Sequence, residues 1–339
     1  MRRALCFMIA LTASAASTAT VNDLVSIVRD AIQHRRSDSR TAGAVRKLEL
    51  SERLDWRTVE ELESEGAGPQ TVSALEMLLD ESQRMPAPAH PPEFASPANP
   101  GRAEQNRVLE AAARNSLNYS AGLPDFLCTE TVRRYEDFKL KDKEDWKLKD
   151  TLTMRLSYFS HAEDYQLVAI NGHPTFRTYE EVGGAVSEGE FGSLLTSIFR
   201  DAPRDRFAWD HWTTLRRRPA HVYRFHIGVE ESTYNVNFAA SYTQRPMMTR
   251  AGQSGFIYVD QATNRVLRIL ALADDIPADF PVTNVSDLVD YDFVDIAGTP
   301  FLLPIRALVR MGTTRVQTKN ELAFEKYRKF TSDATITFH

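Results

Sequence analysis

Residues 207–223, FAWDHWTTLRRRPAHVY, contain two histidines and an aspartate and are the segment of this sequence best suited to acid–base chemistry. Hydrolases use an aspartate to orient a histidine, which in turn activates a nucleophile. Asp210 directly precedes His211, however, and adjacent residues of a strand point to opposite faces. We therefore expect that Asp210 does not orient His211, and that His211 and His221 have packing or surface roles. A hydrolase that uses these residues is the third of three functional hypotheses.

Three aspartates, Asp290, Asp292 and Asp295, form a second candidate group in the stretch LVDYDFVDIAGTPFLLPIRALVRM at 288–311. A calcium loop needs oxygen ligands at alternate positions, followed by a glycine and a distant glutamate, and this spacing does not occur here. Strand alternation instead places Asp290 and Asp292 on a solvent-facing side. The sequence therefore predicts a solvated strand face and no metal site.

The remaining reactive residues also have simpler explanations. The sequence contains no zinc-protease motif HExxH, no nucleophile elbow GxSxG and no phosphate loop GxxxxGK[ST]. Cys128 alternates in phase with Phe126 in FLCTET, a setting typical of a small buried hydrophobe. Glu188 and Glu190 lie where a helix begins and are explained as part of its cap. We predict no catalytic residue, no metal and no cofactor, and a protein that is not an enzyme.

The first nineteen residues, MRRALCFMIALTASAASTA, predict a secretory signal peptide, 1–19, with cleavage after Ala19 and Ala15 as the second candidate position. Its apolar run is too short for a spanning helix, which needs about 20 apolar residues, and no other stretch has that length. Cleavage would remove one of the two cysteines and leave Cys128 alone, so that no internal disulfide forms. We expect a soluble chain without a transmembrane segment, secreted across the inner membrane and periplasmic or extracellular.

The charge balance argues against a nucleic-acid partner. The formal net charge is −5, and loss of Arg2 and Arg3 with the signal makes it more negative. The turn EGAGPQT at 65–71 resembles a helix-hairpin-helix motif, which can present backbone amides to a phosphate. Acidic residues nevertheless outnumber basic ones by 13 to 9 in residues 20–84. We therefore predict that this region is a packing or protein-contact unit.

The apolar periodicity divides the chain into two structural regions. Residues 20–84 repeat apolar side chains at helical spacing, beginning with Val21, Leu24, Val25 and Val28, and predict a small helical domain. Residues 85–101, MPAPAHPPEFASPANPG, carry six prolines and predict a stiff, extended linker. Residues 102–339 form the second predicted domain.

This second predicted domain begins with a helix at 102–118. After it, apolar residues recur at every second position. Alternation at 151–158 is typical of a strand with one wet and one buried face. Further strands are predicted at 126–135, 165–170, 221–227, 234–238, 256–259, 266–272, 305–311, 315–324 and 334–338. An amphipathic helix in SEGEFGSLLTSIF, 187–199, interrupts them. The predicted fold class is α+β: a curved antiparallel β-sheet, an open half-barrel covered by helices, preceded by a small all-α unit.

The segments GFIYVDQATNRVLRI (255–269) and DYDFVDIAGTPFLLPIRALVRM (290–311) resemble the C-terminal part of the LolA-like group, the periplasmic lipoprotein carriers and their outer-membrane lipoprotein-sorting relatives. The resemblance covers 105–338 in outline and 255–311 at motif level. It implies an open, curved antiparallel sheet whose concave side, covered by helices, holds acyl chains or another apolar partner. The matching positions are Asp260, Thr263, Arg268, Tyr291, Gly298 and Pro304.

The first functional hypothesis is a secreted cell-envelope binding protein, not an enzyme, that holds a lipid or other apolar ligand, or a lipidated protein, between sheet and helix. The second is a protein–protein interaction module of the envelope that takes no small ligand. The volume enclosed between sheet and helix would discriminate between them. The predicted apolar lining consists of Leu156, Tyr158, Leu194, Leu195, Ile198, Phe199, Tyr291, Phe293, Ile305, Ala307 and Val309.

Overall fold

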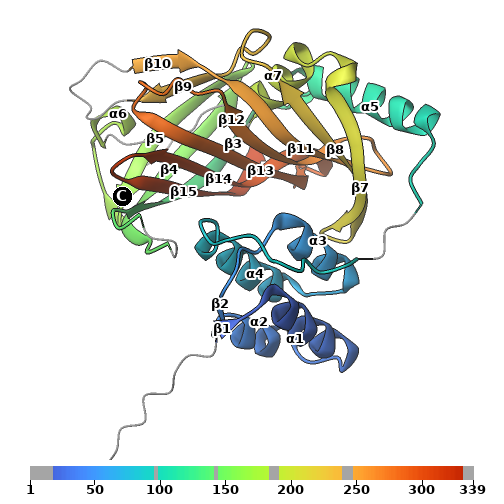
Figure 1. The fold of residues 1–339 in the computed structure, drawn as a ribbon. Helices are drawn as coiled ribbons and strands as arrows, with labels where there is room; N and C mark the ends of the chain where they lie inside the picture. Colours follow the sequence, from blue (N-terminus) through green and yellow to red (C-terminus); the bar gives the residue numbers. More distant parts are fainter. Residues whose placement is uncertain (1–17, 95–97, 141–143, 183–190, 239–246, 331–339) are drawn as a thin grey trace, which may run out of the picture. The chain divides into compact units, whose positions relative to one another are not determined.

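The computed structural model describes residues 18–94, 98–140, 144–182, 191–238 and 247–330. Within the chain there are two compact units, residues 1–94 and residues 95–339 (Figure 1). The predicted signal peptide falls almost entirely on residues 1–17, outside the described residues.

The first unit is helical. Thr20 and Asp23 form a reciprocal capping box at the start of its first helix, and Asp55 caps the third helix by accepting a hydrogen bond from the Thr58 backbone N–H at 2.8 Å. Gly66 ends that third helix in the left-handed conformation, with φ +115°. The helices and strands of the first unit are β1 (Thr18–Ala19), α1 (Val21–Gln33), α2 (Asp38–Val45), β2 (Glu49–Leu50), α3 (Trp56–Glu65) and α4 (Pro69–Glu81).

Part of the predicted proline linker lies along this first unit. The Pro86 carbonyl accepts a hydrogen bond from the Arg53 backbone N–H at 2.8 Å, and the His90 carbonyl accepts one from the Asn22 side chain at 2.8 Å. The Arg29 guanidinium lies over the Phe94 ring, 5.3 Å from its centroid. The segment therefore packs on the helical unit as far as Phe94, because its carbonyls and Phe94 have partners there.

The second unit is a mixed α+β domain built around one large sheet. Its helices are α5 (Arg102–Leu117), α6 (Tyr179–Val182) and α7 (Ser193–Asp201), with short 3₁₀ turns at Ser120–Gly122 and Arg204–Arg206. Its strands are β3 (Phe126–Asp137), β4 (Lys147–Phe159), β5 (Ala162–Ile170), β6 (His173–Pro174), β7 (Phe207–Leu215), β8 (Arg218–Ile227), β9 (Asn235–Phe238), β10 (Met247–Arg250), β11 (Gly252–Asp260), β12 (Val266–Asp274), β13 (Val282–Ile296), β14 (Thr299–Thr313) and β15 (Gln317–Lys329).

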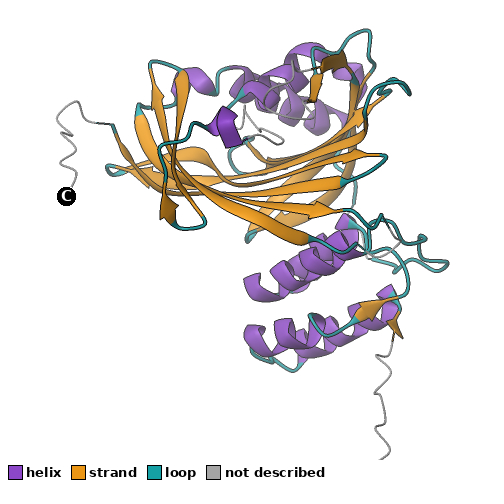
Figure 2. Ribbon diagram, turned by 90° about the vertical axis from the view of Figure 1, so that its left-hand side faces the viewer, coloured by secondary structure: helices purple, strands orange, loops and turns teal. Residues whose placement is uncertain are grey.

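In the part of the chain that the structure describes, eleven strands form an open antiparallel sheet in the order β6-β5-β4-β3-β15-β14-β13-β12-β11-β8-β7. Most neighbours in the sheet are also neighbours in the chain, and the pairing of β3 with β15 joins the two ends of the meander. Figure 2 shows the sheet curving beneath the helices that cover one of its faces. This architecture confirms the predicted fold class, since alternating strands with one apolar face need a covering layer on that face only.

The predicted strand alternation and most predicted strands are confirmed, with some displaced boundaries. Leu152, Met154, Leu156 and Tyr158 are buried on one side of β4, as the period of two indicated. The helix predicted at 187–199 is present as α7, which begins at Ser193; its predicted cap at 187–190 lies outside the described residues. The strand predicted at 334–338 also lies outside the described residues.

Glycine is required at position 255 on β11, because the backbone of the paired strand β12 lies very close to it. Its φ is +154°, and a Cβ built there would lie 1.9 Å from the carbonyl oxygen of Leu270 on the paired strand β12. No rotation of a side chain relieves a clash between a Cβ and a backbone oxygen. The contact between these two central strands therefore depends on glycine at this position.

We expect Gly255→Ala to lower the free energy of unfolding by about 2 kcal/mol or more, because β11 must move away from β12 to admit the methyl group. Gly228→Ala is the matched control, since a Cβ at Gly228 has no other atom within 4 Å. Urea unfolding measures both variants. Equal stability of the two variants would contradict this account of Gly255.

Candidate functional site

One row of apolar side chains crosses the sheet on the face beneath the helices. Its members are direct cross-strand neighbours, so they form a continuous layer over eight strands. Each member is at least 97% buried. The row consists of Tyr223, Ile257, Ile269, Val289, Ala307, Leu322, Val132 and Leu152, and we call it the concave apolar row.

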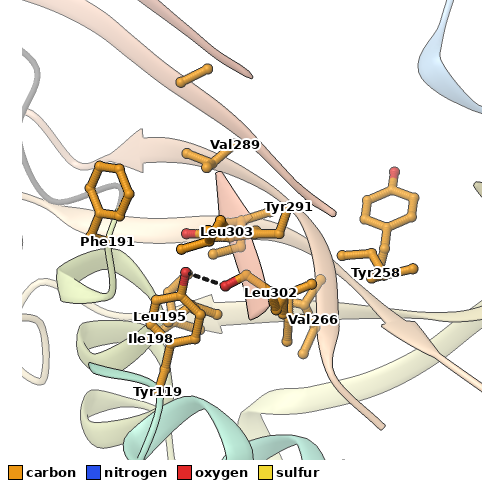
Figure 3. Close-up of a cluster of buried hydrophobic side chains, with 14 of the residues drawn as sticks. Tyr119, Phe191, Leu195, Ile198, Tyr258, Val266, Val289, Tyr291, Leu302 and Leu303 are labelled. Carbon is orange, nitrogen blue, oxygen red and sulfur yellow. Dashed lines mark hydrogen bonds between the residues drawn. The ribbon is translucent and has the colours of Figure 1, made fainter. Parts of the chain in front are cut away.

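Helices α5 and α7 cover this row. Leu195, Ile198 and Phe199 of α7 lie in the same buried cluster as the row, because the helix presents one apolar stripe to the sheet. The Tyr119 hydroxyl, just after α5, donates a hydrogen bond to the Leu302 carbonyl at 2.9 Å (Figure 3). The Tyr223 hydroxyl donates to the Gln105 carbonyl in α5, also at 2.9 Å. Two tyrosines thus fix the α5 segment to the sheet.

Most residues of the predicted lining meet in this cluster. Leu156, Tyr158, Leu195, Ile198, Phe199, Tyr291 and Ala307 are buried in it, and Leu194, Phe293 and Val309 pack against it while partly buried. Ile305 is the exception and is not part of this cluster. On the paired strands Asp290 lies opposite Arg306 and Tyr291 lies opposite Pro304, so Ile305 is the extra residue of a bulge. The contact of these residues with a ligand stays a prediction.

The described part of this layer is filled by the protein's own side chains. The hollow bounded by α5, α7 and the sheet, next to Tyr119, Leu195 and Leu302, measures about 10 Å³. Ligand pockets usually measure about 300–1,000 Å³. The Phe126 ring lies 5.2 Å from that of Tyr158 and 5.3 Å from that of Phe191, which fills the neighbouring space. A ligand therefore needs these side chains to move.

Polar side chains mark one end of the concave face. Asp287 lies two residues before Val289 on β13 and accepts a hydrogen bond from the Tyr234 hydroxyl at 2.9 Å. Burial raises the pKa of Asp287 to about 6, although the Tyr234 hydrogen bond opposes this. Gln253 is 1% exposed on the same face of β11, and within the described ranges neither polar atom of its amide has a hydrogen-bond partner. We call Asp287, Tyr234 and Gln253 the polar end.

The polar end was not predicted from the sequence, although one signal for it is present there. Asp287 alternates in phase with Val285 and Val289, an acid at an inward position of an apolar strand. Such a position predicts a buried carboxyl with an unusual environment. The partner, Tyr234, lies far away in the sequence and could not be inferred from spacing.

A second buried charge on the concave face is fully paired. Arg134, two residues beyond Val132 on β3, donates two hydrogen bonds of 2.6 Å to the Asp150 carboxylate on β4. Their side chains are 4% and 13% exposed. This two-point contact leaves the pair without net charge. Arg134 therefore offers a ligand no unneutralised positive charge.

The expectation for Asp210 and His211 was wrong. Asp210 is the extra residue of a β-bulge between Trp209 and His211, so the usual alternation fails, and its Oδ2 lies 2.7 Å from His211 Nδ1. His211 pairs with Val222, the neighbour of His221 on β8, so the two histidines point to opposite faces. The structure does not bring Asp210, His211 and His221 into one catalytic group.

His221 is a packed aromatic residue. It is 1% exposed, accepts a hydrogen bond from Trp209 Nε1 at 3.3 Å, and its ring centroid lies 4.0 Å from that of Trp212. Burial lowers its pKa. Cys128 is likewise buried, and burial raises the pKa of its thiol, which disfavours a nucleophilic thiolate.

Asp290 does not face water, contrary to the expectation from sequence. It is 1% exposed on the face opposite the concave apolar row, where its carboxylate accepts hydrogen bonds from Arg268 Nε and Arg306 Nε, both at 2.6 Å. Arg216 Nη1 lies 3.1 Å away. Burial would raise the pKa of Asp290, but the charges of Arg268, Arg306 and Arg216 hold it far below its usual range. Asp292 is the more exposed of the two aspartates, with 36% of its side chain accessible.

Several residues that match the LolA-like pattern form turns or contacts between strands. The Asp260 carboxylate accepts hydrogen bonds from the Thr263 backbone and hydroxyl at 2.9 and 2.6 Å, which closes the β11–β12 turn. Gly298 has φ +85° in the β13–β14 turn. Arg268 binds Asp290, as described above. In this chain these side chains therefore shape the sheet rather than a reactive site.

Comparison with models of protein families and with curated proteins finds no match. Among solved structures, the chain resembles an outer membrane lipoprotein-sorting protein domain from Vibrio parahaemolyticus, with 10% identity over 68% of this chain and 95% of that chain and a TM-score of 0.31. It also resembles a DUF1329 family protein from Desulfovibrio piger, with 9% identity, 68% and 94% coverage and a TM-score of 0.27.

A third likeness is to the MucA/MucB complex of Pseudomonas aeruginosa, with 9% identity, 64% and 93% coverage and a TM-score of 0.18. The Vibrio domain carries the description of the group that the sequence resembles. At these TM-scores the likenesses carry no argument about function.

Two further observations concern membranes and metals. In the described ranges, no helix has both the length and the apolar character needed to cross a membrane. The His, Cys, Asp and Glu side chains of those ranges do not gather in any group of three that would hold a metal ion.

We expect Asp290→Asn to lower the free energy of unfolding by roughly 3–5 kcal/mol, because it leaves three guanidinium groups without their shared carboxylate. Since the folded pKa of Asp290 is lowered, its contribution is present above the unfolded pKa of about 3.9 and is lost as the pH falls below that value. Urea unfolding at pH 7 and pH 3 measures both effects. Asp292→Asn is the control and should cost less than about 1 kcal/mol; a similar cost for both variants would contradict the burial of Asp290.

Asp287→Asn should act in the opposite direction. The folded pKa of Asp287 is raised to about 6, so the wild-type protein loses stability as the pH rises through 6 and this partly buried carboxyl ionises. We expect the variant to be more stable than wild type by about 1–2 kcal/mol at pH 8 and nearly equal at pH 4. Denaturant midpoints at the two pH values test this, with exposed Asp279→Asn as control. A gain that does not change with pH would contradict it.

Proposed function

We propose that this protein is a cell-envelope binding protein that takes up an apolar chain, such as the acyl chain of a lipid or lipidated protein, between α7 and the sheet. The observation that carries the proposal is the concave apolar row, which runs over eight strands and is covered by short helices rather than by a second sheet. The export signal predicted at 1–19 supports the compartment.

The filled interior means that the ligand must replace protein side chains. Lifting Leu195, Ile198 and Phe199 of α7 from the layer costs roughly 1.5–3 kcal/mol for each side chain. An acyl chain gains about 0.8 kcal/mol for each buried methylene. A chain of about ten methylenes therefore offsets the removal of all three side chains. Helix α7, with nine residues, is the smallest part of the cover that can move to admit it.

The polar end supports a further property of this ligand. The Gln253 amide can donate and accept hydrogen bonds, and Asp287 carries negative charge above a pH of about 6. A phosphate or carboxylate next to Asp287 would be repelled. The arrangement therefore favours a neutral hydroxyl or amide group attached to the apolar chain over an anionic head group.

The second candidate function is a protein-interaction module without a small ligand. The observation in its favour is the filled interior, together with large apolar side chains that are exposed on the surface. Phe138, Leu148, Phe159, Phe176 and Met248 belong to this exposed set. In that case α7 is a permanent part of the core and does not move.

Binding of a fluorescent long-chain fatty alcohol to residues 20–339 separates the two functions. We expect the wild-type chain to bind the probe and Ala307→Phe to weaken binding at least tenfold, because the new ring fills the floor of the concave layer. Ala323→Phe is the matched control: Ala323 pairs with Arg306, on the opposite face of the sheet, and its substitution should change binding less than twofold. Circular dichroism checks that both variants fold.

Two outcomes would overturn the proposal. The first is a wild-type chain that binds neither the fatty alcohol nor any extractable lipid, which favours the interaction module. The second is an equal loss of binding in Ala307→Phe and Ala323→Phe, which would place the probe elsewhere. A fatty acid that binds more tightly than the alcohol would contradict the role given to Asp287.

A further inference from the structure

The helical unit, residues 1–94, contains a pocket of about 180 Å³ that no part of the proposed function uses. It lies between the C-terminal end of α1 and the turn that joins α3 to α4. It is lined by the apolar side chains of Val28, Ala31, Ile32 and Ala67 and by the polar side chains of Arg36, Asp38, Thr41 and Thr71. Arg35, which is exposed, also lines it, and we call its position the rim. A buried cavity of about 150 Å³ accepts one benzene molecule, so this pocket has the size of a single large side chain.

The nearby turn, which resembles a helix-hairpin-helix, is closed to phosphate. The Asp38 carboxylate accepts hydrogen bonds from the backbone N–H groups of Gln70 and Thr71, at 2.8 and 2.9 Å, and from the Thr71 hydroxyl at 2.7 Å. A Cβ at Gly68 would lie 2.5 Å from that carboxyl group, so glycine is needed for this contact. Burial raises the pKa of Asp38, but the hydrogen bonds from Thr71 and Gln70 outweigh it and hold the pKa below its usual value. An internal carboxylate thus already occupies the first turn of α4.

Arg35 occupies a backbone position that usually belongs to glycine. Its N–H bonds to the Ile32 carbonyl, and the Arg36 N–H bonds to the Ala31 carbonyl, which is the Schellman pattern at the end of a helix. Arg35 has φ +49°, in the left-handed region that disfavours a side chain. Neither capping nor turn formation requires an arginine side chain here, which leaves the guanidinium free to contact a ligand.

The charge of Arg35 is not neutralised within the described part of the chain. Arg36 pairs with Asp30 at 2.6 Å, and His34 Nδ1 lies 2.9 Å from the same carboxylate. Arg35 is exposed and makes no ion pair among the described residues. Since the Asp38 carboxylate is held by the α4 backbone, the rim of the pocket presents a guanidinium that can bind an anion.

We propose that this pocket binds the C-terminal residue of a partner protein, with a large apolar side chain on Ile32 and Ala67 and the terminal carboxylate paired with Arg35. The size of the pocket fits one such side chain, and the charge at its rim fits the carboxylate that adjoins it. This proposal is independent of ligand binding by the sheet.

Methyl NMR of the full chain, residues 20–339, tests the proposal with two peptides: acetyl-Gly-Gly-Phe with a free carboxylate and the same peptide as an amide. We expect the carboxylate peptide to shift the methyl signals of Val28 and Ile32 and to bind about fivefold more tightly than the amide, the range of an exposed ion pair. Arg35→Gly should fold well, because glycine suits φ +49°, yet should bind both peptides equally weakly.

Two variants complete the experiment. Ala67→Leu fills the pocket and should abolish the shifts caused by either peptide. Arg40→Gln is the control, because Arg40 is an exposed arginine of α2 that does not line the pocket, and it should change neither affinity.

The proposal is overturned if the two peptides bind wild type equally, if Val28 and Ile32 do not shift, or if Arg40→Gln weakens binding as much as Arg35→Gly. Equal shifts on addition of inorganic phosphate alone would also overturn it, because the site would then bind anions without an apolar side chain.

Discussion

The pairing of β3 with β15 is the contact on which the sheet domain depends. It joins residues 126–137 to residues 317–329, so the two ends of the meander meet in the interior of the sheet. Without it, β3 to β6 would form one small sheet and the other seven strands another, each with its own exposed edge. The concave apolar row crosses this junction between Leu322 and Val132. One continuous apolar layer exists only because this distant pair forms, and the covering helices depend on that layer.

The two faces of the sheet follow from alternation, and the bulges decide where alternation fails. Bulges lie between Trp209 and His211 and between Asp290 and Tyr291. The first places Asp210 beside His211, although adjacent residues of a regular strand diverge. The second occurs immediately after Asp290, where three arginines converge on one carboxylate. At the first position a polar contact replaces the regular alternation, in accord with the tendency of bulges to redirect side chains. Asp290, in contrast, contacts its regular cross-strand neighbours Arg268 and Arg306.

The sequence therefore predicted the features that depend on a local pattern of residues. It did not predict the features that depend on partners distant in the sequence. The strand with Leu152 and Tyr158 and the apolar stripe of α7 follow from periodicity, and both are confirmed. Asp290 was placed on the correct face, but its burial comes from arginines on three other elements, which no local pattern reveals. The filled interior was also beyond prediction, because the volume between helix and sheet depends on how all the side chains interlock rather than on their hydrophobicity.

A filled interior and a role in binding apolar ligands are compatible when the cover is small. The same three side chains of α7 that complete the core are those a ligand would replace, so closed and occupied states bury similar apolar surfaces. Under the proposed function, the difference in free energy between these two states is small because large terms cancel. The hydrogen bonds made by Tyr119 and Tyr223 would then hold α5 in place during a movement of α7. The Gln253 amide, which has no hydrogen-bond partner among the described residues, would add to this difference, because a polar ligand group would supply that partner. A buried polar group of this kind would thus favour the ligand-bound state of the proposed function.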